Sequence, residues 1–230
     1  MKNILFLFIL PLYLTQCSAQ DTVLRKNRLS DSVLERYYVF KSDPTIKQGP
    51  YKALFRRRTV VASGNYTKNL KTGTWQFFDS AGKLVEKYDY DKSEFTYEAP
   101  AYAGEDFSYL FDDSLKSGDR LTRPIKIGGI YYGYIPYVNL FQLPFNMFDV
   151  DPYDFDAYVE LLISPMGRLA DYNVHITSVT YEYDHLFKMD VNLFSPEDRT
   201  FIPATFNGKP VLTRIIIKCF VTSDGGLDFY

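Results

Sequence analysis

The chain has 230 residues, of which 46% are apolar, 17% aromatic and 23% charged, with a formal net charge of −2. This composition excludes a largely disordered chain, because enough apolar surface is present to offset the entropy of ordering. It also argues against a nucleic-acid binder, whose binding surface is normally basic. The length predicts a packed globular protein of one or two domains.

Residues 1–19 have the pattern of a signal sequence. Lys2 precedes an apolar run from Ile4 to Leu14, and small and polar residues follow it. The run is too short to span a bilayer as a helix, so it predicts a secretory signal peptide that is cleaved after Ala19. The alternative is a lipoprotein signal, because Leu14 lies three residues before Cys17, which would then carry a lipid and hold the protein on a membrane. Both interpretations predict an exported protein, in the periplasm or otherwise outside the cytoplasm.

Charge divides the remaining chain into two parts. Residues 20–97 contain 15 basic and 9 acidic residues, whereas residues 98–230 contain 10 basic and 19 acidic ones. Such asymmetry predicts two modules with these boundaries. They would meet between Tyr97 and Gly104, where proline and small residues interrupt the patterns on both sides.

The first module contains an internal repeat of 24 residues. Aligning the chain with itself at this offset superposes four pairs: Gly49 on Gly73, Tyr51 on Trp75, Leu54 on Phe78 and Tyr66 on Tyr90. The pattern predicts short strand pairs, each entered by a glycine turn, with alternate aromatic residues on one face. Residues 63–90 resemble the MORN-like variant repeats of bacterial envelope proteins, and the resemblance implies a β-scaffold without catalytic residues.

Three consecutive arginines, Arg56, Arg57 and Arg58, lie inside the first repeat unit. One hypothesis is a patch for an anionic envelope polymer, which would fit the positive net charge of the module. The preferred interpretation is a solvated strand or sheet edge, where charge prevents unwanted strand pairing.

The second module carries a more specific pattern near its end. Asn207–Gly208 is the preferred two-residue turn of a β-hairpin, so the apolar stretches on its two sides are expected to pair. The segment that contains this turn resembles the closing motif of the C-terminal domain of TonB, the energy transducer of outer-membrane import. The matching residues are Pro203, Ala204, Asn207, Gly208, Lys209 and Pro210.

The resemblance to TonB implies an α+β fold, with a C-terminal antiparallel sheet and about two helices. Residues 158–169 resemble the first hairpin of the family, residues 105–116 its first helix and residues 181–194 its second. The second helix would place four apolar or aromatic residues on one face: Tyr183, Phe187, Val191 and Phe194. A tyrosine-rich insertion at about residues 115–152 has no counterpart. The family's membrane-spanning segment and proline-rich spacer are not seen, so the resemblance implies the fold and binding by strand addition, and leaves a link to TonB-type transport open.

The closing strand, Thr213–Val221, is the predicted binding element. One face carries Arg214, Ile216, Lys218 and Phe220. At the end of a small sheet this strand would offer unpaired backbone groups, which predicts a non-catalytic module that binds an envelope protein by strand addition. Two alternatives are the binding of an anionic polymer or glycan through the basic and tyrosine-rich surfaces, and, less favoured, an unrecognised hydrolase.

Neither a catalytic site, a cofactor nor a metal is predicted. Cys219 alternates with apolar residues and is expected to lie in the core. His175 and His185 have no further ligands at zinc spacing, and no phosphate loop or nucleophile elbow occurs. Four aspartates lack the pattern of a calcium loop and are interpreted as a solvated turn: Asp149, Asp151, Asp154 and Asp156.

Overall fold

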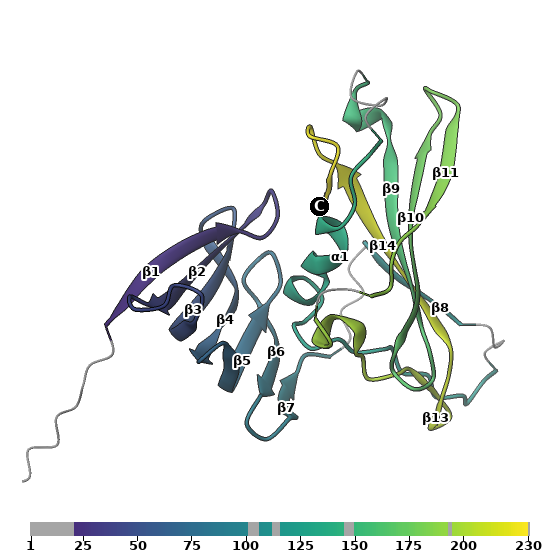
Figure 1. The fold of residues 1–230 in the computed structure, drawn as a ribbon. Coiled ribbons are helices and arrows are strands. Elements are labelled where there is room, and N and C mark those ends of the chain that lie inside the picture. Colours follow the sequence, from purple (N-terminus) through teal and green to yellow (C-terminus); the bar gives the residue numbers. More distant parts are fainter. Residues whose placement is uncertain (1–20, 101–105, 112–115, 145–149, 193–194, 230) are drawn as a thin grey trace, which may run out of the picture.

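A computed structural model describes residues 21–100, 106–111, 116–144, 150–192 and 195–229. The proposed signal peptide, Cys17 included, lies outside these residues. Two antiparallel sheets lie side by side (Figure 1), with 53% of the structure in strands and 7% in helical turns. In the described ranges, no helix is long and apolar enough to cross a membrane.

The N-terminal sheet is a seven-stranded meander in which every strand pairs with its neighbours in the sequence. Its strands are β1 (Thr22–Arg28), β2 (Val33–Phe40), β3 (Lys47–Phe55), β4 (Thr59–Thr67), β5 (Leu70–Phe78), β6 (Leu84–Asp89) and β7 (Glu94–Glu98). The two repeat units are the hairpins β3–β4 and β5–β6, as the spacing predicts. Gly49 and Gly73 occupy equivalent places, each with a positive φ (91° and 63°), where a glycine is favoured.

The C-terminal sheet has six strands in the order β11–β10–β9–β14, with β8 and β15 both pairing with the far side of β14. These strands are β8 (Phe107–Phe111), β9 (Asp156–Ile163), β10 (Leu169–Ser178), β11 (Tyr183–Lys188), β14 (Thr213–Val221) and β15 (Leu227–Phe229). The residues of β14 alternate between the core and solvent, and Cys219 is fully buried as expected.

A described part of the tyrosine-rich insertion, residues 131–143, lies between the two sheets. It contains a 3-10 turn, η1 (Tyr132–Tyr134), and the short helix α1 (Ile135–Asn139), which Figure 1 places in the gap between the N-terminal and C-terminal strands. Tyr134 and Tyr137 are almost completely buried there. Gly128 permits this close packing, since a Cβ on it would lie 2.6 Å from the Cα of Gly133.

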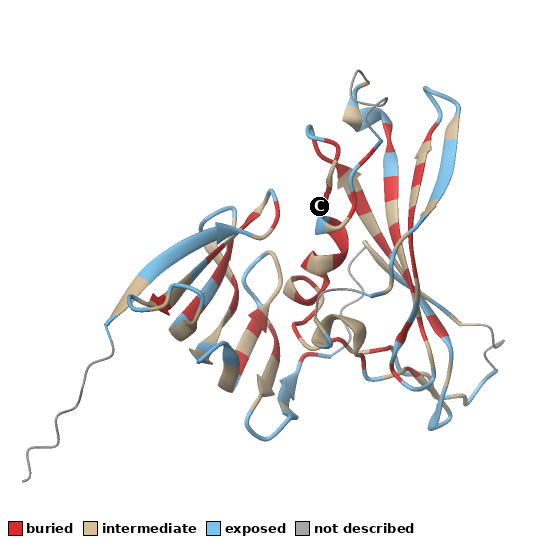
Figure 2. Cartoon of the chain, in the orientation of Figure 1, coloured by how far each residue is buried: buried red, intermediate tan, exposed pale blue. Residues whose placement is uncertain are grey.

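Buried residues of both sheets and of the insertion form one continuous apolar cluster (Figure 2). A polar contact also joins the turn after β1 to strand β15, because the buried carboxylate of Asp228 accepts hydrogen bonds from the Ser30 hydroxyl at 3.2 Å and from the Ser32 N–H at 2.7 Å. The chain passes from one sheet to the other after Glu98, and residues 101–104 of the predicted boundary lie outside the described residues. Two modules that unfold separately remain a prediction.

The α+β expectation is wrong, because the protein is mostly β and has one short helix among the described residues. The predicted second helix is instead the strand β11, and the described part of the predicted first helix is β8. Tyr183 and Phe187 suggested a helix because they are four residues apart, but this spacing also places two residues on one face of a strand. Their rings pack inward against Phe155 and Phe141.

The Asn207–Gly208 turn is present, with positive φ at both residues (50° and 79°). It joins two very short strands, β12 (Thr205–Phe206) and β13 (Lys209–Pro210). The long strand β14 does not pair across this turn, contrary to expectation, and bonds instead to β9 and β8. Pro203 and Ala204 lead into the small hairpin, and the Ala204 carbonyl accepts a hydrogen bond from the Val211 N–H at 3.0 Å.

Candidate functional site

The strand predicted to bind a partner is an inner strand of the sheet. In β14, Ile216 stands opposite Glu160 of β9 on one side and opposite Ser108 of β8 on the other. Backbone groups on both sides of β14 are therefore used within the protein, and the expected open edge at this strand is wrong.

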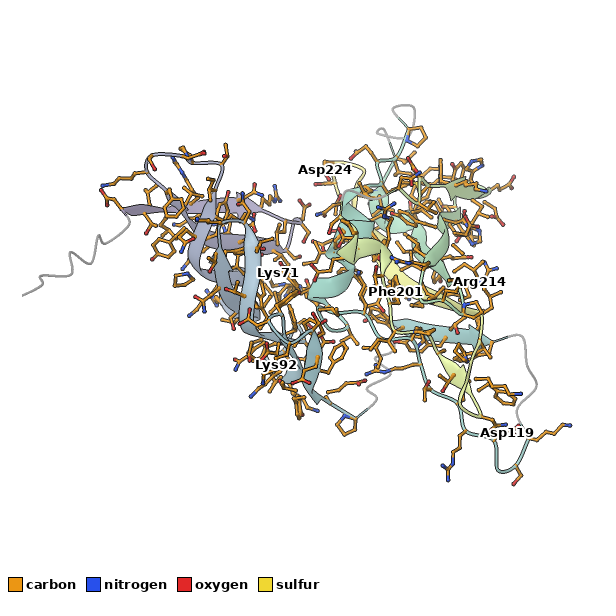
Figure 3. The ribbon with its side chains drawn as sticks, turned by 60° about the horizontal axis from the view of Figure 1, so that its bottom comes forward. Lys71, Lys92, Asp119, Phe201, Arg214 and Asp224 are labelled. Carbon is orange, nitrogen blue, oxygen red and sulfur yellow. The ribbon has the colours of Figure 1, made fainter. Side chains whose placement is uncertain are left out.

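The side chains named for that strand lie on the solvent-facing side of the C-terminal sheet. Arg214 is exposed, and Ile216, Lys218 and Phe220 are half-buried. The Arg214 guanidinium binds Glu160 at 2.8 Å, and Figure 3 shows it on the side of the sheet away from the N-terminal strands. These residues form a mixed surface rather than a cleft.

The three arginines occupy the turn between β3 and β4. Arg56, Arg57 and Arg58 are all exposed, and the first two have positive φ (44° and 62°). The Arg56 N–H donates to the Ser32 carbonyl at 2.7 Å, and the guanidinium of Arg56 lies 5.0 Å from the centre of the Phe55 ring. The segment is therefore a charged hairpin turn, and neither a strand nor a sheet edge.

A cleft of about 730 Å³ lies between the two sheets, and we call it the intersheet cleft. The N-terminal sheet contributes lysines and tyrosines, and the C-terminal part contributes a tyrosine and carboxylates. Its main residues are Lys47, Tyr66, Lys71, Tyr90, Tyr132 and Glu197. Figure 3 shows Lys71 near the junction of the two sheets.

The 24-residue repeat creates two equivalent clusters in this cleft. The ammonium group of Lys47 lies 5.2 Å from the ring centre of Tyr66 and 5.8 Å from that of Tyr51. Lys71 and its neighbours repeat this arrangement one unit later, with distances of 5.1 Å to Tyr90 and 5.2 Å to Trp75. At such distances a cation is attracted to the face of an aromatic ring. Each repeat unit therefore presents one lysine held over two aromatic residues of the same unit, and Lys47 also lies 4.4 Å from the ring centre of Tyr37 in β2.

Trp75 lies beneath the aromatic rings of these clusters. It is fully buried, its ring centre lies 5.2 Å from that of Tyr66 and 5.8 Å from that of Tyr90, and its indole N–H donates to the Asn65 carbonyl at 3.2 Å. Gly73 begins the unit two residues earlier. Trp75 thus fixes the tyrosines that line the cleft without lining it itself.

Each lysine also has a carboxylate partner. Lys47 lies 3.5 Å from Glu35, which is buried. Lys71 lies 2.8 Å from Glu197, which also accepts a hydrogen bond from the Tyr90 hydroxyl at 2.5 Å. Burial would raise the pKa of Glu197, but Lys71 and the hydroxyl outweigh burial and hold this pKa below its ordinary value. The carboxylate is therefore ionised and is an acceptor only.

The insertion completes the cleft through Tyr132. Its hydroxyl is 2.9 Å from that of Tyr51, and its ring stacks on Phe77. Burial raises the pKa of Tyr132, so the phenol stays neutral at physiological pH and keeps its proton as a hydrogen-bond donor. The insertion, whose role the sequence does not indicate, thus supplies one wall of the site.

Two further ionisable groups, Glu86 and Lys126, are buried near each other outside the lining of the cleft. Burial raises the pKa of Glu86 to about 7, against the effect of backbone N–H groups of Gly128 and Gly129. Burial lowers the pKa of Lys126 to about 8, although acidic neighbours oppose this. The Lys126 ammonium donates to the Glu197 carbonyl at 3.0 Å and lies 4.9 Å from the ring centre of Phe201, so it supports the turn that carries Glu197.

The remaining candidates for chemistry form no site. His175 lies 2.7 Å from Asp184, burial raises the pKa of the Cys219 thiol, and Asp151 bonds to the backbone of its own turn. Asp149 lies outside the described residues, within which no cluster of His, Cys, Asp and Glu suited to a metal ion occurs. Sequence reasoning did not identify Lys47 and Lys71, although the 24-residue offset relates them as it relates Tyr66 and Tyr90.

No protein-family model, curated protein or solved structure matches this chain. The resemblances to MORN-like repeats and to the TonB C-terminal domain therefore remain predictions.

Proposed function

We propose that this chain is an exported, non-catalytic binding protein of the cell envelope, and that it holds a carbohydrate chain in the intersheet cleft. The observation that carries the proposal is the pair of equivalent lysine and tyrosine clusters side by side in one cleft. A ligand built from repeating units is complementary to a site built from repeating units.

The chemistry of the lining suits sugars. A sugar ring has an apolar face of C–H groups and a rim of hydroxyls, and aromatic side chains with polar tips can cover the face while polar groups bond the rim. Tyr66, Tyr90 and Tyr132 provide rings, and Glu197 and the two lysines provide acceptors and donors.

Charge in the cleft argues against a strongly anionic polymer. Lys47 and Lys71 are each already paired with a carboxylate, so the cleft has no excess positive charge from them. We therefore favour a neutral or zwitterionic carbohydrate, whose binding should change little with salt, since salt screens mainly the attraction between net charges.

Titration of the mature protein with N-acetylglucosamine oligomers of increasing length, together with sedimentation on isolated peptidoglycan, tests the proposal. We expect affinity to rise with length until both clusters are occupied, and to fall about tenfold in Tyr66→Ala and in Tyr90→Ala, as for the loss of one aromatic contact. Tyr97→Ala, on an exposed tyrosine of β7 outside the cleft, is the matched control. Failure to bind either probe, or equal binding by all four proteins, would reject the proposal.

A second candidate function, protein binding by strand addition, is favoured by a different observation. The strand β11 is an edge of the C-terminal sheet, unlike β14.

A further inference from the structure

The free edge of β11 has a defined hydrogen-bonding pattern. In its register with β10, Lys188 stands opposite Asn173. The next facing pair is Met189 and Tyr172, and it is hydrogen-bonded, since the Met189 N–H donates to the Tyr172 carbonyl at 2.9 Å. Because bonded and non-bonded pairs alternate in antiparallel strands, the odd-numbered residues of β11 bond to β10. The N–H and C=O groups of Asp184, Leu186 and Lys188 therefore point away from β10.

No strand among the described residues pairs with the outer edge of β11. Strand β11 has β10 as its neighbour on one side, and Figure 1 shows it at the outer margin of the sheet. Its pairing with β10 runs without a bulge, and the strand contains no proline. Natural sheets often protect an edge strand with a bulge or a proline, and β11 has neither. This edge is therefore open to pairing, although its charged side chains restrict the choice of partner.

The outward side chains of β11 carry opposite charges at equal distances from Leu186. An acidic residue, Asp184, lies two positions before it, and a basic residue, Lys188, lies two positions after it. All three are exposed, and Leu186 keeps 52% of its surface in solvent although it is apolar. A strand with this pattern is complementary to an antiparallel copy of itself.

We propose that β11 pairs antiparallel with β11 of a second copy of this chain, about a twofold axis at Leu186. Leu186 then faces the partner's Leu186, and Asp184 faces the partner's Lys188 on both sides of the axis. These are the residues whose backbone groups are free, so each facing pair exchanges both N–H···O bonds. The side-chain charges and the outward-pointing backbone groups thus select the same register.

The inner face of β11 supports this register. The rings of His185 and Phe187 are 4.4 Å apart within one strand. The proposed axis places His185 opposite the partner's Phe187, so an aromatic row continues from one subunit into the next, and such cross-strand contacts stabilise a sheet. The two six-stranded sheets become one continuous sheet, with the intersheet clefts outside the contact.

The mass of the full mature protein, measured by analytical ultracentrifugation over a range of concentrations, tests this proposal. We expect a dimer that dissociates on dilution, because the contact is confined to one short strand. In Leu186→Pro, only an outward backbone donor is lost, so we expect a folded monomer. A monomer at every concentration, or a dimer that persists in Leu186→Pro, would overturn the proposal.

A charge exchange tests the register itself. Asp184→Lys places like charges opposite each other across the axis and should weaken the dimer at least tenfold. Adding Lys188→Asp to Asp184→Lys restores opposite charges and should restore the dimer. If the double variant stays monomeric while its unfolding is unchanged, the register is wrong; if the pure protein is monomeric and a different protein is cross-linked to β11, the second copy is the wrong occupant.

Discussion

Lys71 of β5 and Glu197 of the 3-10 turn η4 (Glu197–Arg199) form an ion pair of 2.8 Å between the two sheets, although 126 residues separate them in the sequence. The Tyr90 hydroxyl donates to the same carboxylate. One carboxylate thus links the second repeat unit to the C-terminal part of the protein. The pair orders one wall of the intersheet cleft and holds the two sheets together.

Replacing one partner of this ion pair should lower the free energy of unfolding more than replacing both partners. Lys71→Met leaves Glu197 partly buried without its cation, and we expect a loss of about 1–2 kcal/mol, less than for a fully buried pair because both groups keep some contact with solvent. Lys71→Met combined with Glu197→Gln should recover part of this loss. Urea unfolding of both single variants and the double variant measures the coupling, and strictly additive losses would show that the pair is not coupled.

The buried Glu86 should make stability depend on pH. Its pKa is raised from 4.5 to about 7, so the folded protein keeps a proton that the unfolded chain releases. The free energy of unfolding contributed by this group is therefore present below pH 4.5 and is lost as the pH rises through 7, by up to about 3 kcal/mol. Glu86→Gln should flatten the profile between these values, whereas the exposed variant Glu94→Gln should follow the wild type; a wild-type profile in Glu86→Gln would contradict this origin.

Gly64 should be intolerant of any side chain. A Cβ at this position would lie 2.2 Å from the Trp75 ring, so Gly64→Ala must displace this ring or the strand beside it, and should lower the free energy of unfolding by about 1–3 kcal/mol. Gly73→Ala meets no atom within 4 Å and has only the strain of its positive φ, about 1 kcal/mol. Because Trp75 is the only tryptophan of the chain, its fluorescence reports both the unfolding and the displacement. An unshifted spectrum in Gly64→Ala would show that the ring does not move.

The small hairpin at Asn207–Gly208 should be more sensitive to substitution at Gly208 than at Lys209. Gly208 has a φ of 79° and free space where a Cβ would be, so Gly208→Val should cost about 1 kcal/mol or more through backbone strain. Lys209 is exposed, and Lys209→Ala should be nearly silent. Thermal unfolding of the two variants compares them, and equal melting temperatures would contradict the strain argument.

Local patterns in the sequence predicted local structure well. The alternation from Thr213 to Val221 gave the bounds and faces of β14, and the 24-residue offset gave the hairpins of the N-terminal sheet. The error over Tyr183 and Phe187 arose because a spacing of four residues satisfies a helix and a strand equally. Their burial against Phe155 and Phe141 decides between the two, and the sequence does not show those contacts.

Position within a sheet could not be predicted, because it depends on distant segments. Ser108 of β8 pairs with Ile216 of β14, although more than a hundred residues separate them in the sequence. Because of this pairing, the strand that was expected at the edge is an inner strand. The cleft was missed for the same reason. Lys71 and Tyr90 belong to a repeat that the sequence shows, but their partner Glu197 comes from the other end of the chain.

The contact between Ser30 and Asp228 has a consequence for the order of folding. The strands of the N-terminal sheet pair with their sequence neighbours, so this meander can form early, since local contacts close at a small entropic cost. The turn at Ser30, by contrast, forms its hydrogen bonds to a carboxylate only when Asp228, 198 positions later in the sequence, has taken its place in the C-terminal sheet. The turn between β1 and β2 is therefore completed only when the C-terminal sheet is in place, although the strands on its two sides belong to the meander that can form early.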